Sequence, residues 1–165
     1  MGFWLMAWAK HGTETLAGTA DSVTSTGTAT KFNVVMSHLF PSGADTFRYL
    51  RFNSDGGSFY ARRFSINGGS DGTGESVALV NTGIADGDNF NLSYHGNISG
   101  EEKLGILWVI NSTDVGAGTA PSRGEFVLKY APSSLTDTLD SIEYYNDNAG
   151  VDYEANSNIS ALGSD

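Results

Sequence analysis

Histidine is the residue in this chain whose chemistry best suits a general base or a metal ligand, because the sequence contains no cysteine. The three histidines, His11, His38 and His95, stand alone in different segments, and no two have the short spacing of a zinc-binding pair. His38 lies within the apolar run FNVVMSHLF, which favours a packed sheet residue over a catalytic base. Nucleophilic catalysis and a zinc site therefore have little support, and the lack of cysteine excludes disulfides and thiolate chemistry.

Carboxylates beside glycine offer calcium chemistry as a second possibility. Asp86 and Asp88 flank Gly87, and Asp71 and Glu75 lie in the glycine-rich stretch SDGTGE. Calcium needs several oxygen ligands on a flexible loop, but neither stretch follows the twelve-residue EF-hand pattern. Aspartate beside glycine is also what tight β-turns require. We interpret these stretches as turns, and we predict no metal ion and no cofactor.

Glycoside hydrolysis would need two carboxyl groups that face each other at a fixed separation. Four glutamates fall in or beside candidate strands: Glu75, Glu125, Glu143 and Glu154. Nothing in their spacing selects a pair, and a glutamate beside an aromatic residue is equally explained as the outward half of an alternating strand. The sequence therefore indicates no catalytic residues, and we expect that the protein is not an enzyme.

Four of the nine cationic residues lie within one short part of an otherwise acidic chain. They are Arg48, Arg51, Arg62 and Arg63. Arginine is favoured at protein interfaces because its guanidinium binds carboxylates in a bidentate manner and stacks on aromatic rings. These four side chains are the candidate partner-binding residues, and internal pairing with the many carboxylates is the alternative.

Aromatic residues near loops suggest a second kind of surface. Sugar rings stack on exposed aromatic side chains, and Tyr144, Tyr145 and Tyr153 lie in or near predicted loops. These three tyrosines are the candidate glycan-binding residues. The alternative is that aromatic residues in strands form the core, and this alternative is strongest for Trp108.

Short β-branched and aromatic runs, separated by glycine, asparagine, aspartate and serine, must position all these residues. The segments are 7–16, 20–28, 32–40, 46–52, 58–66, 75–80, 89–95, 103–110, 124–130, 140–145 and a weak tail strand near 152–161. This rhythm predicts an all-β fold, an antiparallel jelly-roll-like β-sandwich of about ten strands with little or no helix. The run KLGILWVI (103–110) is predicted to be a central strand, in which Gly105 marks a bulge or a close backbone approach.

One segment departs from this rhythm. In SSLTDTLDSIEYY, Leu135, Leu139 and Ile142 have helical spacing, and Ser134 begins a sequence that resembles a capping box. We predict a single helical turn there, followed by a strand from about residue 140. A full helix is the alternative.

Length and charge set the remaining bounds. The 165 residues suffice for one domain, with residues 1–6 as an irregular N-terminal extension, and Met1 and Met6 both remain candidate start residues. The apolar N-terminal stretch is too short to cross a bilayer or to serve as a signal sequence. The formal net charge of −10 disfavours binding to nucleic acid or to an anionic membrane surface.

Several phrases of the sequence resemble a group of short, poorly characterised structural proteins of tailed bacteriophages, especially marine ones. These phrases are FNSDGGSFYARRFSINGGSD, NISGEEKLGI, GAGTAPSR and the terminal LGSD. The residues that match the pattern of the group are Phe52, Asn53, Asp55, Tyr60, Ala61, Arg63, Asn67, Gly68, Asn97, Ile98, Glu102, Lys103, Leu104, Ala117, Gly118, Ala120, Pro121, Arg123 and Leu162 to Asp165. The resemblance covers residues 6–165, and it implies a viral origin and a role in the virion.

The resemblance, taken with the arginines, leads to the expectation of a capsid decoration or cement protein on the capsid exterior. Its partners would be copies of itself, as a homotrimer or another symmetric oligomer, and the major capsid protein or another virion protein. An adhesion module at a tail or fibre that binds host-surface glycan is the alternative.

Overall fold

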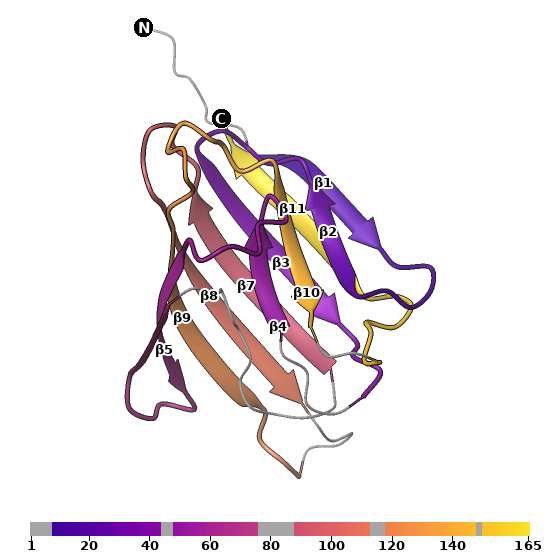
Figure 1. Cartoon of the computed structure of the whole chain (residues 1–165). Helices are drawn as coiled ribbons and strands as arrows, with labels where there is room; N and C mark the ends of the chain where they lie inside the picture. Colours follow the sequence, from indigo (N-terminus) through magenta and orange to yellow (C-terminus); the bar gives the residue numbers. More distant parts are fainter. Residues whose placement is uncertain (1–7, 44–47, 76–87, 113–117, 148–149) are drawn as a thin grey trace, which may run out of the picture.

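Side chains that alternate between inward and outward positions are typical of the strands of this protein. The computed structural model describes residues 8–43, 48–75, 88–112, 118–147 and 150–165 (Figure 1). These residues contain eleven strands and no helix. The strands are β1 (Ala9–Thr15), β2 (Ser22–Thr26), β3 (Phe32–Leu39), β4 (Arg48–Phe52), β5 (Tyr60–Ile66), β6 (Gly72–Glu75), β7 (Asp88–Gly96), β8 (Lys103–Ser112), β9 (Ser122–Tyr130), β10 (Ser141–Asn146) and β11 (Asn158–Ser164).

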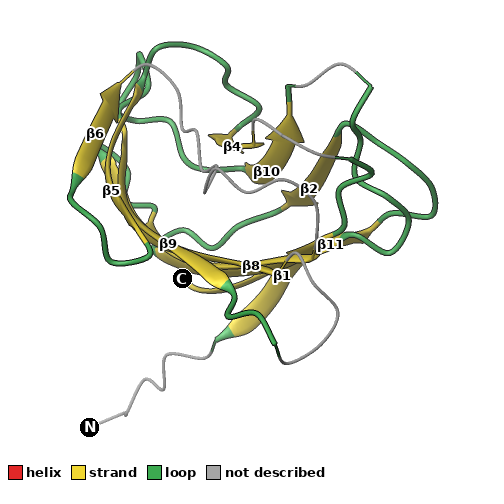
Figure 2. Cartoon of the chain, turned by 90° about the horizontal axis from the view of Figure 1, so that it is seen from below, coloured by secondary structure: helices red, strands yellow, loops and turns green. Residues whose placement is uncertain are grey.

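The strands form two antiparallel sheets. The large sheet has eight strands in the order β1-β11-β3-β7-β8-β9-β5-β6, and the small sheet has three in the order β2-β10-β4. Figure 2 shows the large sheet curving around one side of the small sheet. The predicted antiparallel β-sandwich is confirmed, and β8 is a central strand of the large sheet as its sequence predicts.

The core fills the space between the two sheets. Leu107 and Val109 of β8 are buried there, together with Leu50 of β4 and Ile142 of β10. An aromatic cluster closes one part of this core, since the Tyr60 and Tyr130 rings stack at 4.8 Å and the Phe52 and Tyr130 ring centroids lie 5.4 Å apart. Burial of such side chains drives folding, because each removes apolar surface from water.

A tight turn moves the chain from one sheet to the other after β4. Asn53 and Ser54 both have a φ of 54°, and the Asp55 carboxylate accepts a hydrogen bond of 2.8 Å from the Gly57 N–H. Asparagine tolerates this backbone angle, and NSDGG is one of the glycine-, asparagine-, aspartate- and serine-rich separators that the sequence predicts between strands. It leads from β4 in the small sheet to β5 in the large sheet.

The segment between β9 and β10 contains a turn instead of the predicted helical turn, so that prediction is wrong. The Asp137 N–H donates to the Ser134 carbonyl at 3.1 Å, and no helix follows. Hydrogen bonds to residues distant in the sequence fix the conformation of this segment. The Asn97 side chain accepts from the Leu139 N–H at 2.7 Å, while the Lys103 ammonium donates to the Leu135 carbonyl at 3.5 Å.

Replacing Asn97 by alanine is expected to lower the free energy of unfolding by about 2–3 kcal/mol, because buried polar groups would lose their partners. Asn97 is buried, and its amide also donates to the Ala29 carbonyl at 2.8 Å. Urea unfolding followed by circular dichroism measures the effect. Asn158→Ala is the control, since its amide donates to the Asn156 carbonyl at the exposed surface. A loss for Asn97→Ala no larger than for the control would contradict the prediction.

Parts of several sequence predictions fall on residues that lie outside the described part of the chain. They include the N-terminal extension over residues 1–6, the first residue of the strand at 7–16, the first two residues of the strand at 46–52, and all but the first residue of the strand at 75–80. Glu75 itself ends β6. The part of the chain that the structure describes contains no helix with the length and apolarity of a membrane span.

Candidate docking surface

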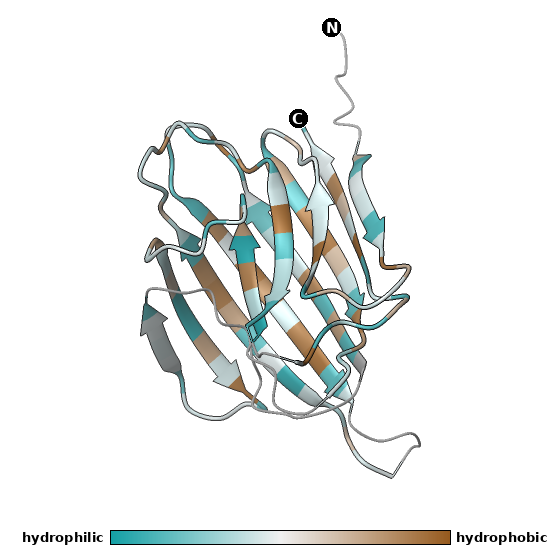
Figure 3. Cartoon of the chain, turned by 45° about the vertical axis from the view of Figure 1, so that its right-hand side comes forward, coloured by the Kyte–Doolittle hydropathy of each residue, from teal (hydrophilic) through white to brown (hydrophobic). Residues whose placement is uncertain are grey.

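The face of the large sheet turned away from the small sheet carries an unusual number of hydrophobic side chains. Seven of them, on β7, β8 and β9, have 38–58% of their surface exposed. They are Phe90, Tyr94, Leu104, Ile106, Trp108, Ile110 and Val127, and we name this set the outer apolar face. Figure 3 shows hydrophobic residues as bands that cross the strands of the large sheet.

The strand register makes the outer apolar face continuous. Tyr94 pairs with Ile106, which pairs with Val127, so one row crosses three strands. In the next rows Trp108 lies opposite Leu92, and Ile110 lies opposite Phe90. Side chains opposite each other on antiparallel strands are in contact range, so these residues form one patch.

The patch is large for a protein surface. Seven half-exposed side chains of these types present on the order of 700 Å² of accessible area, above the roughly 300–600 Å² of the largest patch on a typical monomer. An exposed apolar patch of this size is typical of an interaction site.

Ion pairs border the outer apolar face on the side of β5 and β9. Arg63 lies 3.2 Å from Asp71, the Arg123 guanidinium lies 3.8 Å from Glu125, and the third pair joins Lys129 to Glu102 at 3.4 Å. All six side chains are about half exposed. These three pairs place positive and negative side chains next to each other, and Glu75 of β6 adds a further exposed carboxylate at this border. A polar border, or rim, of this kind is expected around an apolar interface core.

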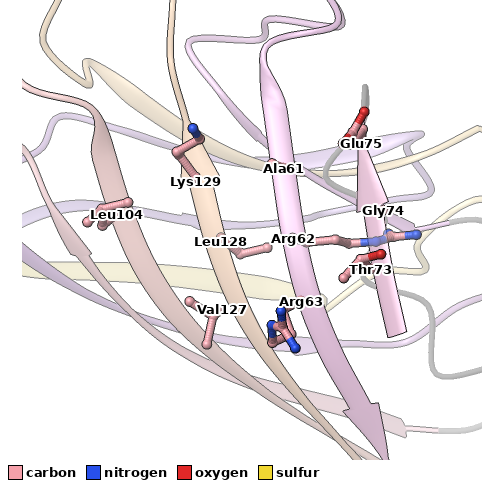
Figure 4. Close-up of a pocket in the computed structure, with 10 residues that line it drawn as sticks. All are labelled: Ala61, Arg62, Arg63, Thr73, Gly74, Glu75, Leu104, Val127, Leu128 and Lys129. Atoms are coloured by element: carbon pink, nitrogen blue, oxygen red, sulfur yellow. The ribbon is translucent and has the colours of Figure 1, made fainter. Parts of the chain in front are cut away.

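A shallow hollow crosses the same edge of the patch (Figure 4). Leu104, Val127, Arg63 and Lys129 contribute to its lining on β8, β9 and β5. Arg62 extends from β5 toward β6, and a Cβ atom at Gly74 would lie only 2.7 Å from its Nε. Leu104 and Val127 belong both to this hollow and to the outer apolar face, so the two are continuous.

The four predicted partner-binding arginines do not lie on one surface. Arg48 is 2% exposed and lies in the interior, where burial lowers the pKa of its guanidinium and the neighbouring Tyr153 opposes that shift. Arg51 lies on the exposed face of the small sheet. Arg62 and Arg63 are consecutive residues of β5 and point to opposite faces, so only Arg63 borders the outer apolar face.

The three predicted glycan-binding tyrosines also separate. Tyr144 and Tyr153 are fully buried, and burial raises the pKa of both phenols, so neither ring can meet a sugar. Tyr145 is partly exposed on the small sheet, but the Arg51 guanidinium lies 3.7 Å from its ring centroid. The neighbouring Tyr49 ring lies 6.4 Å away from that of Tyr145. Among the three predicted tyrosines, Tyr145 alone reaches the surface.

The sequence favours a core position for Trp108, and this prediction is wrong. Trp108 is 42% exposed, because Leu107 and Val109 on either side of it occupy the inward positions of β8. The signal was present in the sequence. A strand with apolar residues at both parities has two apolar faces, and only one can contact the core of a two-layer sandwich.

The metal chemistry considered from the sequence finds no matching cluster of side chains in the described part of the chain. Among the described residues no group of three or more histidine, aspartate or glutamate side chains is placed to hold a metal ion. Asp55 serves its turn and accepts a hydrogen bond of 3.0 Å from the Tyr130 hydroxyl. Asp86 and Gly87 lie outside the described residues.

The sequence also contains one motif typical of nucleophilic catalysis that is not among the candidates above. Residues 68–72, Gly-Gly-Ser-Asp-Gly, have the Gly-x-Ser-x-Gly spacing of a nucleophile elbow, which is a strand-to-helix turn. Here the motif joins β5 to β6, so strand leads to strand, and Ser70 is exposed. The structural context that would make this serine a nucleophile is absent from this hairpin.

No protein-family model matches the chain, and searches of the curated proteins and of the solved structures give no match either.

Proposed function

We propose that this protein is a structural component of a tailed-bacteriophage particle, where it decorates or cements the exterior of the capsid shell. It acts by docking its large sheet against neighbouring protein, and it performs no bond-making or bond-breaking step. The phrases of the sequence that resemble phage structural proteins support the viral setting.

The outer apolar face is the observation that carries the docking part of the proposal. Trp108, Leu104 and Val127 would be costly to leave in water at 42%, 58% and 56% exposure on one continuous surface. A protein repeated around a shell gains avidity from many weak junctions, so a contact of modest affinity is enough. The net charge of −10 keeps such a protein away from packaged nucleic acid.

Quantitative mass spectrometry of purified particles of the encoding phage tests this proposal. We expect the protein in a fixed, near-stoichiometric ratio to the major shell protein, and cryo-electron microscopy should place it on the outer lattice. Absence from the particle, or presence in only a few copies at the tail, would reject the capsid role.

The alternative is an adhesion module that binds host-surface glycan, and the small sheet supplies the observation that favours it. The Tyr49 and Tyr145 ring centroids lie 6.4 Å apart on its partly exposed face, and the Arg51 guanidinium lies 3.7 Å from the Tyr145 centroid and 5.7 Å from the Tyr49 centroid. Two neighbouring rings with a cationic side chain can bind a sugar acid. Glycan-array binding that disappears in Tyr145→Ala, together with a low copy number at the tail, would favour this alternative.

A further inference from the structure

The geometry points to a second copy of this chain as the occupant of the outer apolar face. We propose that two protomers stack their large sheets face to face across a twofold axis, so that each outer apolar face covers the other. This inference rests on the proposed function and specifies it, because the neighbouring protein that covers the outer apolar face would be a second copy of the chain.

Area is the first argument. The roughly 700 Å² of the patch is close to the about 800 Å² per partner that a stable interface of standard size buries. Two sheets that stack face to face pack about 10 Å apart, with their side chains interdigitated as in a sandwich core. Trp108 lies in one of the two central rows of the patch, between the row of Ile106 and the row of Ile110, and is the anchor that such an interface needs.

Charge is the second argument, and it selects a second copy over a basic partner. The chain carries a net charge of −10, so two copies repel each other over most of their surface. The charges within each of the three rim ion pairs offset one another, so two copies can approach at the outer apolar face with a smaller electrostatic penalty than elsewhere. A basic partner would be attracted to the acidic surface elsewhere and would gain nothing from a neutral apolar face.

The arrangement of the rim is the third argument. In a twofold interface, a residue i of one protomer meets residue j of the other, and j then meets i. Arg123 and Glu125 are two residues apart on β9 and lie on the same face, so the arginine of one copy can pair with the glutamate of the other. Arg63 and Asp71 offer a second couple of the same kind. A rim on which positive and negative side chains lie next to each other can form ion pairs with the same rim of a second copy.

Sedimentation velocity tests the proposal, over total protein concentrations from about 1 to about 100 µM. We expect the wild-type protein to form a species with twice the mass of the 17.5 kDa chain. The association should persist at about 0.5 M salt, because burial of apolar area drives it and salt screens only the rim. Trp108→Lys is expected to weaken it by about 100-fold.

Leu135→Lys is the matched control. Leu135 is 42% exposed, as Trp108 is, but lies in the segment between β9 and β10, where its carbonyl contacts Lys103, a residue with the inward parity of β8. This variant should form the same dimer as the wild type. Circular dichroism identifies any variant that fails to fold.

A second measurement does not depend on the lysine variants. Because the chain has no cysteine, Ile106→Cys provides a unique thiol on the outer apolar face. Its reaction with a maleimide should slow as the protein concentration rises, while the thiol of Leu135→Cys should react at a constant rate. A wild-type monomer at the highest concentration, a trimer, or an unprotected thiol at residue 106 would overturn the dimer. Particle composition is measured independently, so failure of the dimer and failure of the capsid role can be distinguished.

Discussion

A Gly105→Ala variant is expected to lose about 3 kcal/mol of unfolding free energy, which is the upper part of the range for overpacked cores. Gly105 is buried in the middle of the large sheet and pairs with His95 on β7. A Cβ atom at this position would lie 2.3 Å from His95 Nδ1 and 3.0 Å from the Tyr94 carbonyl oxygen. The sequence predicted either a bulge or a close approach here, and the close approach is confirmed.

The clash cannot be relieved easily, which is why a large effect is expected. The His95 ring is 1% exposed and packs edge-on against Phe52 at 4.9 Å between ring centroids. Movement of the ring would therefore disturb the aromatic cluster, and movement of Tyr94 would disturb the backbone of β7. Urea unfolding at neutral pH measures the loss.

Gly96→Ala is the matched control for this prediction. Gly96 lies on β7 beside His95, and a Cβ atom there would lie no closer than 3.7 Å to its nearest neighbour, the Leu104 carbonyl oxygen. Alanine reduces the freedom of the unfolded chain, so this change should be neutral or stabilising by up to about 1 kcal/mol. Equal stability of the two variants would show that the space around Gly105 is not limiting.

The strands could be predicted from the sequence because their signal is local. Alternation in segments such as TFRYLRF, and glycine-rich turns between the segments, give the strands and several of the corners without knowledge of the rest of the chain. Gly105 shows that even a contact between strands can leave a local mark, since a glycine inside an apolar strand signals a close neighbour.

The candidate surface depends on information that is not local. Which of two adjacent residues on β10 faces inward depends on the large sheet that packs on one side of the small sheet, so Tyr144 is buried and Tyr145 is partly exposed. Arg48 shares the buried face of β4 with Leu50 and Phe52, and the fold also decides that face. Grouping the arginines by their position in the sequence therefore does not reproduce their arrangement in the fold. Trp108 differs, because the alternation of β8 could have revealed two apolar faces, and only the choice of the inward face required the fold.

Acidification is expected to destabilise the protein well above the pH at which most carboxylates titrate, and His95 is the cause. Burial lowers the pKa of His95 from 6.5 to about 3. Below pH 6.5 the unfolded chain binds a proton at this residue that the folded chain does not bind, so stability falls as the pH falls. The loss should reach about 2 kcal/mol between pH 6.5 and pH 5, and it should continue toward the folded pKa near 3.

The variant His95→Gln identifies the source of this pH dependence. It should be less stable than the wild type at pH 7, because the ring contact with Phe52 is lost, but it should lose little further stability between pH 6.5 and pH 5. His38→Gln is the control, since His38 lies on the outer side of β3 and its replacement leaves His95 in place. Thermal unfolding across this pH range separates the outcomes. A His95→Gln profile as steep as that of the wild type would mean that another group takes up the proton, and that the buried imidazole does not set the acid limit of the fold.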